Sequence, residues 1–227
     1  MATPIRKFSN DLCYHVYNRG VEGHATFTTD RDYNRFLEVV SYYLNGDRIP
    51  YSQYLKLSLE HQKNYLSPKK SSESVRIHVL AYCLMPNHFH FLLKQAKDGA
   101  ISAFMSEISN SYTKYFNTKN KRLGYLFQAS FKAKEVTDEA SFLQVSRYIH
   151  LNPVMSSRVC WKGKPENYPY SSYKRWVEGL KDNIVNMDVV KKFIEFNPSM
   201  YRKFVESKIS QPYYTQNFPD LLLEDEA

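Results

Sequence analysis

The sequence predicts an α+β protein with a ferredoxin-like, split βαβ arrangement, in which helices cover one face of an antiparallel sheet. Two observations support this prediction. Segments rich in aromatic and β-branched residues alternate with segments whose apolar residues recur at helical spacing. Their order is strand, helix, strand, strand, helix, strand, followed by one more helix, and this is the order of a split βαβ unit.

The first part of this core ends at a polar stretch. Residues 12–18, LCYHVYN, are expected to form a strand because they are aromatic and β-branched and precede an Arg-Gly pair. A helix is expected from Asp30, as its N-cap, to about Leu44. Residues 46–75 are polar and contain two prolines, so they are interpreted as an insertion with a helix near 52–66.

The second part of the core contains a hairpin. The expected elements are 76–84 (strand), 88–94 (strand), 99–117 (helix) and 126–136 (strand). A last helix is expected from Asp138, as its N-cap, to about Leu151, because Pro153 should stop it. Residues 1–176 are therefore expected to form one domain with an insertion.

Residues 177–227 are expected to form a helical extension with an acidic tail. Two short helices are expected within it, over 188–196 and 199–209. The pattern leaves open whether they pack on the core or form a small separate unit.

The composition excludes several classes of protein. Of 227 residues, 43% are hydrophobic and 24% charged, which is typical of a globular chain and not of a disordered one. No apolar run is long enough to cross a membrane, and the first residues lack the apolar segment of a secretory signal. Three widely spaced cysteines argue against a disulfide framework. We therefore expect a cytoplasmic protein.

Charge and aromatic content indicate nucleic-acid binding, with a tyrosine-rich core in a mildly basic enzyme as the alternative. The net charge is +8, and 15% of the residues are aromatic. Basic side chains bind phosphates, and aromatic rings stack on unpaired bases. The candidate DNA contacts are Asn18, Arg19, Lys114, Lys119, Lys121, Arg122, Lys132 and Lys134. For Arg19 the alternative is a turn residue paired with Glu22.

His88 and His90 are two residues apart in an expected strand, so their side chains lie on one face of the sheet. Two converging imidazoles can bind a divalent metal ion and leave coordination positions open. Ordinary half-buried histidines are the alternative. Tyr148 and Asn152 are four residues apart in the last expected helix and face the same way. A tyrosine in this position could be a nucleophile beside a metal ligand, or a packing residue.

Four motifs occur in order along the chain: YHVYNRGV (14–21), YCLMPNHFHFLLK (82–94), GYLFQASFKAKEV (124–136) and RYIHLNPV (147–154). Together they resemble the tyrosine transposases of insertion sequences and the REP-associated tyrosine transposases, members of the HUH superfamily of single-strand nucleases. The loop YPYSSY (168–173) is similar to a segment of the REP-associated branch. The resemblance extends over roughly residues 12–176.

The resemblance implies a metal-dependent, single-stranded DNA endonuclease and strand transferase that acts next to DNA hairpins. His88 and His90 match its metal ligands, with Asn152 as a polar third ligand. Tyr148 matches the nucleophile that forms a 5′-phosphotyrosine intermediate. The implied cofactor is a divalent metal ion, Mg²⁺ or Mn²⁺, and the implied partner is single-stranded or hairpin DNA.

The resemblance also bears on assembly and location. Dimers are common in the insertion-sequence branch and monomers are expected in the REP-associated branch, so monomer and homodimer stay open. The implied location is the bacterial cytoplasm, in association with the nucleoid.

Two alternatives to an active transposase remain. RNA-recognition modules also bind unpaired bases on a ferredoxin-like sheet, although no run here has their aromatic signature. A non-catalytic or domesticated protein that kept only hairpin binding would carry the same motifs.

Overall fold

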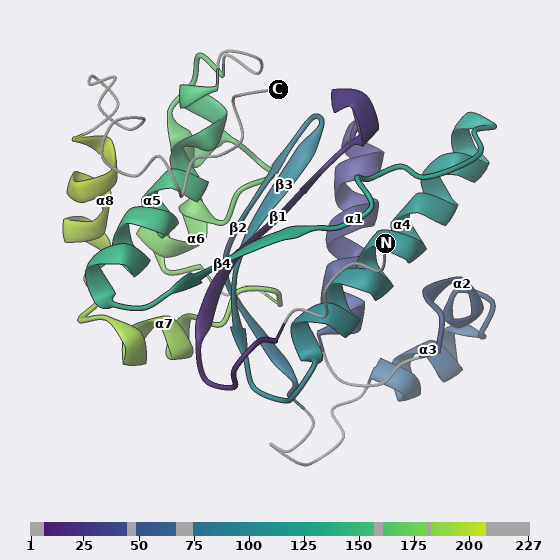
Figure 1. Ribbon diagram of the computed structural model, residues 1–227, viewed down its shortest axis with the longest axis horizontal. Coiled ribbons are helices and arrows are strands. Elements are labelled where there is room, and N and C mark those ends of the chain that lie inside the picture. Colours follow the sequence, from purple (N-terminus) through teal and green to yellow (C-terminus); the bar gives the residue numbers. More distant parts are fainter. Residues whose placement is uncertain (1–6, 45–48, 67–74, 157–160, 181–182, 208–227) are drawn as a thin grey trace.

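The computed structural model describes residues 7–44, 49–66, 75–156, 161–180 and 183–207. Four strands form one antiparallel sheet in the spatial order β2-β3-β1-β4 (Figure 1). The strands are β1 (Cys13–Arg19), β2 (Ile77–Met85), β3 (His88–Gln95) and β4 (Lys132–Val136). Helices α1 (Asp30–Tyr43) and α4 (Ala100–Asn120) connect them, so the split βαβ prediction is confirmed.

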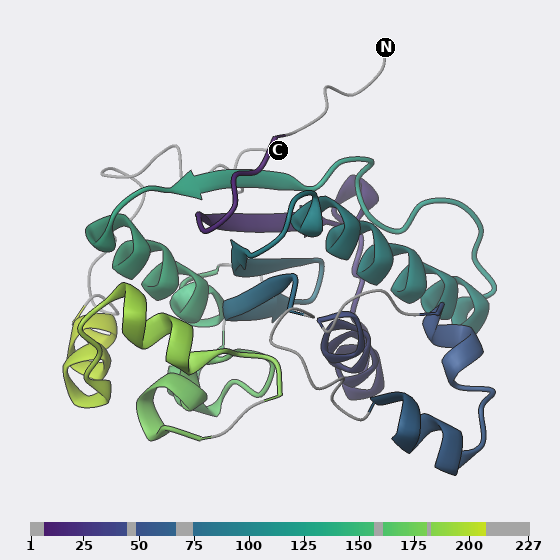
Figure 2. The ribbon, with the colours of Figure 1, turned by 90° about the horizontal axis from the view of Figure 1, so that it is seen from below.

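The apolar core lies between the sheet and the pair α1 and α4. Side chains alternate across a strand, which directs Phe89 and Phe91 of β3 toward these helices. The ring of Phe36 in α1 lies 5.0 Å from that of Phe89, and Phe104 in α4 lies 6.4 Å from Phe91. A view from below shows α1 and α4 on one side of the sheet and α5 (Glu139–Met155) on the other (Figure 2).

The start of α1 differs from the prediction by one residue. Thr29, and not Asp30, is the N-cap, and Thr29 and Asp32 form a capping box in which each side chain accepts a bond from the other residue's backbone N–H. Burial alone would raise the pKa of Asp32, but hydrogen bonds from Lys119 and Thr28 outweigh it and lower the pKa to about 2.

Two further predictions about the core are corrected. Only Lys132–Val136 of the expected strand 126–136 pairs continuously with β1, because pairing is interrupted between the isolated bridge at Phe127 and Lys132. Asp138 caps α5 as expected, accepting a bond from the Ser141 N–H at 2.8 Å. Pro153 does not stop α5, which continues to Met155. The proline lies in the last turn, where only one helical hydrogen bond is lost.

The insertion forms two short helices instead of one, α2 (Tyr51–Tyr54) and α3 (Leu59–Leu66). The rings of Tyr51 and Tyr54 pack 5.0 and 4.8 Å from that of Tyr42 in α1. Ser58 interrupts the helix and accepts a bond from the His61 N–H, which begins α3. The insertion is therefore attached to the core through tyrosine rings that pack edge-on or tilted against one another.

The C-terminal segments pack on the core. The short helices are η3 (Pro165–Asn167), α6 (Tyr173–Glu178), α7 (Met187–Phe193) and α8 (Pro198–Glu206). The indole N–H of Trp176 in α6 donates to the Leu80 carbonyl of β2 at 3.0 Å, and the chain forms a parallel bridge at Val79 and Val185. The expected boundary at residue 176 lies within α6. The acidic tail and the end of the second expected helix lie outside the described residues.

The described helices and the buried cysteines also bear on the expectations from the sequence. None of the helices that the structure describes combines the length and the apolar character needed to cross a membrane. Cys13 and Cys83 are buried free thiols, and burial raises the pKa of Cys13 to about 12. Cys160 lies outside the described residues.

Candidate functional site

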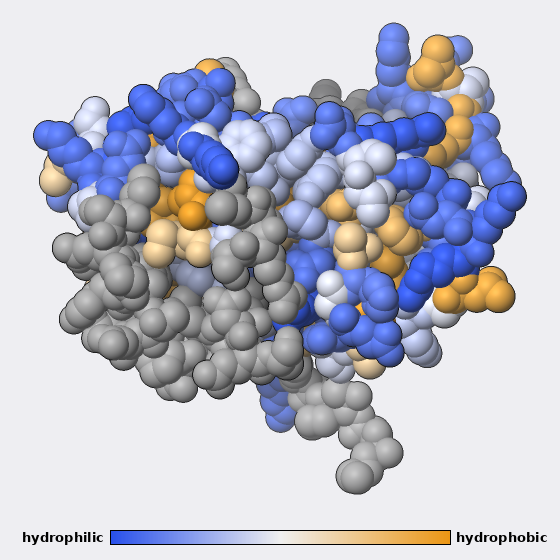
Figure 3. Space-filling model, turned by 90° about the horizontal axis from the view of Figure 1, so that it is seen from above, coloured by the Kyte–Doolittle hydropathy of each residue, from blue (hydrophilic) through white to orange (hydrophobic). Residues whose placement is uncertain are grey.

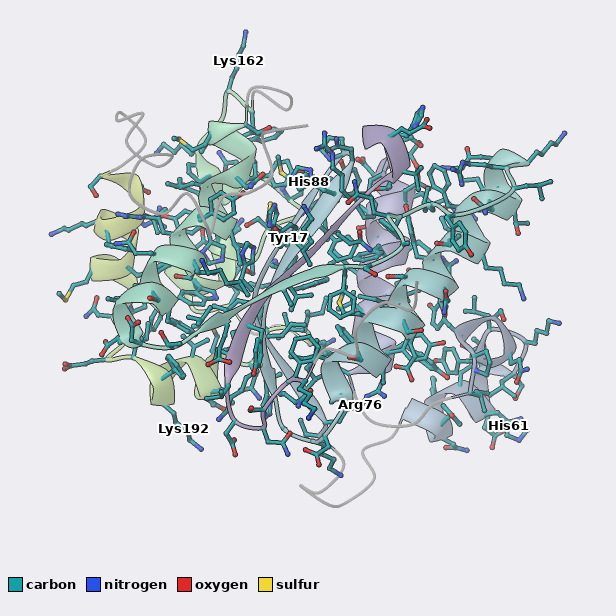
Figure 4. The ribbon with its side chains drawn as sticks, viewed as in Figure 1. Tyr17, His61, Arg76, His88, Lys162 and Lys192 are labelled. Atoms are coloured by element: carbon teal, nitrogen blue, oxygen red, sulfur yellow. The ribbon has the colours of Figure 1, made fainter. Side chains whose placement is uncertain are left out.

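Strand β3 presents His88 and His90 on the face of the sheet that α5 covers. His90 is fully buried, whereas His88 at the start of the strand is partly exposed. Their ring centroids are 5.0 Å apart with the rings nearly perpendicular. Figure 4 shows His88 and Tyr17 near the middle of the molecule, with His88 closer to the end of the strands.

Helix α5 brings Tyr148 and Asn152 to the same place. The Tyr148 ring lies 5.4 Å from the ring of His90 and 5.8 Å from that of His15, edge-on to both. The Asn152 side-chain amide lies 3.2 Å from His90 Nε2. This arrangement arises because Phe142, Val145 and Ile149 on the helix are buried and fix its rotation about its axis. The structure thus brings His90 of β3 together with Tyr148 and Asn152 of α5, two elements that are far apart in the sequence.

A chain of hydrogen bonds defines the protonation of His90. Its Nδ1 lies 3.0 Å from Nε2 of His15, and both side chains are buried. Burial lowers the pKa of His90 to about 3, so the ring is neutral at physiological pH. With the Asn152 amide N–H facing Nε2 of His90, Nε2 accepts, and Nδ1 carries the proton and donates it to His15. His90 therefore presents a nitrogen lone pair toward Asn152, as a metal ligand must.

In His88, as in His90, Nδ1 is the hydrogen-bond donor of the ring. Its Nδ1 lies 2.7 Å from Oδ1 of Asn87, an amide oxygen that can only accept. Nδ1 therefore carries a proton, and in the neutral ring the lone pair of His88 lies on Nε2. In both histidines a neighbouring side chain selects the tautomer.

His90 and Asn152 are spaced as two ligands of one divalent metal ion would be. Two ligand atoms about 2.1 Å from one ion at a right angle are about 3 Å apart, close to the separation of His90 Nε2 and the Asn152 amide. A half-turn of the amide exchanges its nitrogen for its oxygen at the same position. In the described part of the chain, no group of three His, Cys, Asp or Glu side chains could hold a metal. A site here therefore depends on an amide as its third donor.

The predicted DNA contacts fall into two groups. Lys132 and Lys134 of β4 pair with Tyr17 and His15 of β1, so they lie on the face of the sheet that carries the histidines. Lys132 Nζ is 5.9 Å from the centre of the Tyr17 ring. Along the sheet, Arg19 of β1 pairs directly with His88, and these two lysines follow one strand further away on β4.

The other predicted contacts lie elsewhere or have structural partners. Lys114 and Lys121 are exposed on α4 and at its end. Lys119 forms an ion pair with buried Asp32 at 2.7 Å. The Arg122 guanidinium donates to the Tyr125 carbonyl at 2.7 Å.

Of the two predicted contacts in β1, Asn18 is buried and Arg19 is partly exposed. Asn18 is only 6% exposed, accepts a bond from the Arg19 N–H and donates to the Gln128 carbonyl. These bonds give Asn18 a role in the fold. The Arg19 guanidinium lies against Gly23, where a Cβ atom would stand 3.2 Å from its Nη2.

His15 was not among the predicted site residues. The strand pattern could have found it, because His15 and Tyr17 lie on one face of β1 and β1 neighbours β3. Its hydrogen bond to a residue 75 positions away is a tertiary contact without a local signal.

His150 faces away from this site, as its position two residues after Tyr148 predicts. Its Nδ1 lies 2.8 Å from the Tyr201 hydroxyl and its Nε2 lies 2.8 Å from the Ser172 hydroxyl. The Ser172 hydroxyl accepts a bond from the Tyr82 N–H of β2 at 2.9 Å. This buried network joins α5 to α8 and to the sheet.

Comparisons with known proteins agree with the resemblance. Residues 54–152 match the model of a family described as IS200-like transposase, and this range contains His88, His90, Tyr148 and Asn152. No curated protein matches. A solved structure of a REP-associated tyrosine transposase bound to a REP hairpin is similar, with a TM-score of 0.53 and 15% identity over 82% of this chain and 92% of that chain. This second likeness confirms the fold.

Proposed function

We infer, from the match of residues 54–152 to the IS200-like transposases, that this chain cuts and rejoins single-stranded DNA beside a hairpin. One observation carries the inference, namely that α5 holds both Tyr148 and Asn152 beside His90. The rings of Tyr148 and His90 are 5.4 Å apart, and the Asn152 side-chain amide lies 3.2 Å from His90 Nε2. A packing tyrosine would need neither a polar residue one turn later nor two histidines beneath it.

In the proposed reaction, the Tyr148 hydroxyl oxygen attacks the phosphorus of a phosphodiester. The bond from phosphorus to the 3′ oxygen breaks, Tyr148 loses its proton and the leaving 3′ oxygen gains one. The products are a 5′-phosphotyrosine link and a free 3′-hydroxyl. The number of phosphodiester bonds is unchanged, so the same hydroxyl or another can reverse the step and join strands.

His88, His90 and Asn152 are the proposed ligands of a divalent metal ion. Such an ion supplies positive charge that polarises the phosphoryl oxygen. Two nitrogen ligands favour Mn²⁺ over Mg²⁺ in affinity, because Mg²⁺ prefers oxygen. His15 keeps His90 in the ligating tautomer, and Lys132 and Lys134 lie along the neighbouring strand where they can attract the phosphate backbone.

The proposed substrate is a DNA hairpin with a single-stranded flank. The structural relative was solved with a REP hairpin, and this chain carries a net charge of +8. A basic protein of this kind gains affinity by neutralising phosphates. A protein without catalytic activity that binds hairpins is the alternative, and it would need no metal.

The experiment incubates the protein with hairpin DNA that has labelled single-stranded flanks, with Mn²⁺ or Mg²⁺. We expect a covalent protein–DNA adduct on a denaturing gel for the wild type, and none for Tyr148→Phe or with EDTA. Tyr115→Phe, a partly buried tyrosine on α4, is the matched control and should form the adduct. An adduct formed by Tyr148→Phe would contradict the assignment, and metal-independent binding without cleavage would favour the alternative.

A further inference from the structure

The turn that follows α4 exposes two large apolar side chains. We define this turn as the tip loop, residues Lys121–Tyr125. The Leu123 side chain is 93% exposed and that of Tyr125 is 80% exposed. Side chains this exposed add little to the core, and here an aliphatic and an aromatic one lie two residues apart in one short turn.

The backbone of the tip loop is held by its own hydrogen bonds. Lys121 and Gly124 adopt positive φ angles of 50° and 85°. The Arg122 guanidinium donates to Asn117 Oδ1 at 3.2 Å and to the Tyr125 carbonyl at 2.7 Å. The Asn117 amide N–H donates to the Gly124 carbonyl at 2.8 Å. The loop therefore presents its apolar side chains on a fixed backbone, which reduces the entropy lost on binding.

The chain connects the tip loop to the end of the sheet where His88 begins β3. Directly after the tip loop, Phe127 bridges to Gly20, and the neighbouring Arg19 pairs with His88. From Phe127 to His88 these steps correspond to two strand spacings, about 10 Å, and Tyr125 lies two residues before Phe127 in the chain. In Figure 1 the end of α4 and the turn between β2 and β3 lie toward the same edge of the molecule. A strand of DNA that reaches His88 can thus also reach the tip loop.

The surroundings of the tip loop are basic. Residues 114–134 contain six Lys or Arg and no Asp or Glu, and the side chains of Lys114 and Lys121 are exposed. Seen from this edge, the described surface is mainly hydrophilic, with apolar side chains in small separate groups (Figure 3). An aliphatic and an aromatic side chain on a basic surface match the two parts of a nucleotide, the flat base and the phosphate.

We propose that the tip loop is a base-stacking site, in which Leu123 and Tyr125 contact the face of an unpaired base in the flank of the hairpin. Lys121 lies beside them and attracts the adjoining phosphate. The proposal deepens the proposed function, on which it rests, because it names the part of the substrate that this surface binds. The occupant is single-stranded DNA and not another protein, because residues 114–134 carry six basic and no acidic side chains. Lys119 is paired with Asp32, and Lys114 and Lys121 are exposed.

The test measures binding of fluorescent DNA by anisotropy, for a hairpin with single-stranded flanks and for the same hairpin without them. We expect the double variant Leu123→Ala/Tyr125→Ala to bind the flanked hairpin at least about five-fold more weakly, and the bare hairpin normally. Tyr125→Trp should retain binding. The matched control Leu59→Ala/Met200→Ala removes two side chains that are 77% and 70% exposed, and it should bind both DNAs like the wild type.

The outcomes separate the two proposals. Equal binding of the flanked hairpin by the tip-loop variant and the wild type, with adduct formation intact, would overturn the tip-loop proposal alone. Failure of the wild type to bind the flanked hairpin would overturn the proposed function as well. A wild-type dimer that becomes a monomer in the tip-loop variant, measured by light scattering, would show that the loop contacts a second copy and would also overturn base stacking.

Discussion

Replacement of His15 by phenylalanine tests whether β1 supports the proposed metal site. His15 accepts the Nδ1 proton of His90 at 3.0 Å, and His15 and His90 are 1% and 0% exposed. Phenylalanine has a similar shape but offers no acceptor. The variant leaves a buried N–H group of His90 without this bond and no longer favours the tautomer that ligates through Nε2.

The size of the effect follows from this geometry. A buried donor that loses its acceptor costs about 1–3 kcal/mol. Loss of the hydrogen-bond partner of a metal-ligating histidine lowers metal affinity by about 10- to 100-fold, or about 1.4–2.7 kcal/mol. The two ranges overlap because both describe the same unsatisfied N–H group. We therefore expect the Mn²⁺ dissociation constant to rise at least about 10-fold, with a comparable loss of folding stability.

Isothermal titration with Mn²⁺ and urea unfolding without metal measure the two effects separately. Tyr14→Phe is the matched control, because the Tyr14 hydroxyl of the same strand bonds to Glu135 of β4 and its loss should leave Mn²⁺ affinity unchanged. His15→Gln, which restores an acceptor of similar reach, should recover part of the affinity. Wild-type Mn²⁺ affinity in His15→Phe would refute the reasoning, and a wild type that binds no Mn²⁺ would refute the metal site itself.

Two further predictions concern α5. Asn152→Ala should weaken Mn²⁺ binding about 10-fold or more, whereas Asn152→Asp, which keeps an oxygen and adds a charge, should bind at least as tightly as the wild type in the same titration. Burial lowers the pKa of His150 from 6.5 to about 3, so the unfolded chain binds more protons and stability falls as the pH drops from 6.5 toward 3. From this residue we expect a loss of about 2 kcal/mol between pH 7 and pH 5. His150→Gln, whose amide can still hydrogen bond, should flatten the dependence in urea unfolding at several pH values, and an unchanged slope would contradict the assignment.

Local patterns predicted the elements whose periodicity is strong. The alternation around His88 and His90 placed both on one face of a strand, and the four-residue spacing of Tyr148 and Asn152 placed both on one face of a helix. The errors arose where a local signal competes with tertiary contacts. A proline normally ends a helix. Helix α5 nevertheless continues past Pro153 to Met155, because its buried side packs on the sheet.

The sequence could not assign partners to charged and polar side chains. Lys119 and Asp32 are 87 residues apart, and no local spacing predicts their ion pair. The same holds for the contact of His15 with His90. Charge in the sequence therefore identified a basic protein, but the structure was needed to show which basic residues lie beside the histidines.

The buried network around His150 has a consequence for the exchange of segments between subunits. If α5 of one copy were to complete the active site of another, it would have to leave its own sheet together with the bonds from His150 to Tyr201 and Ser172. Both partners lie after α5 in the chain, so the whole C-terminal part would have to move with the helix or lose these bonds. For the proposed function, the buried network therefore favours a Tyr148 that acts with the histidines of its own chain.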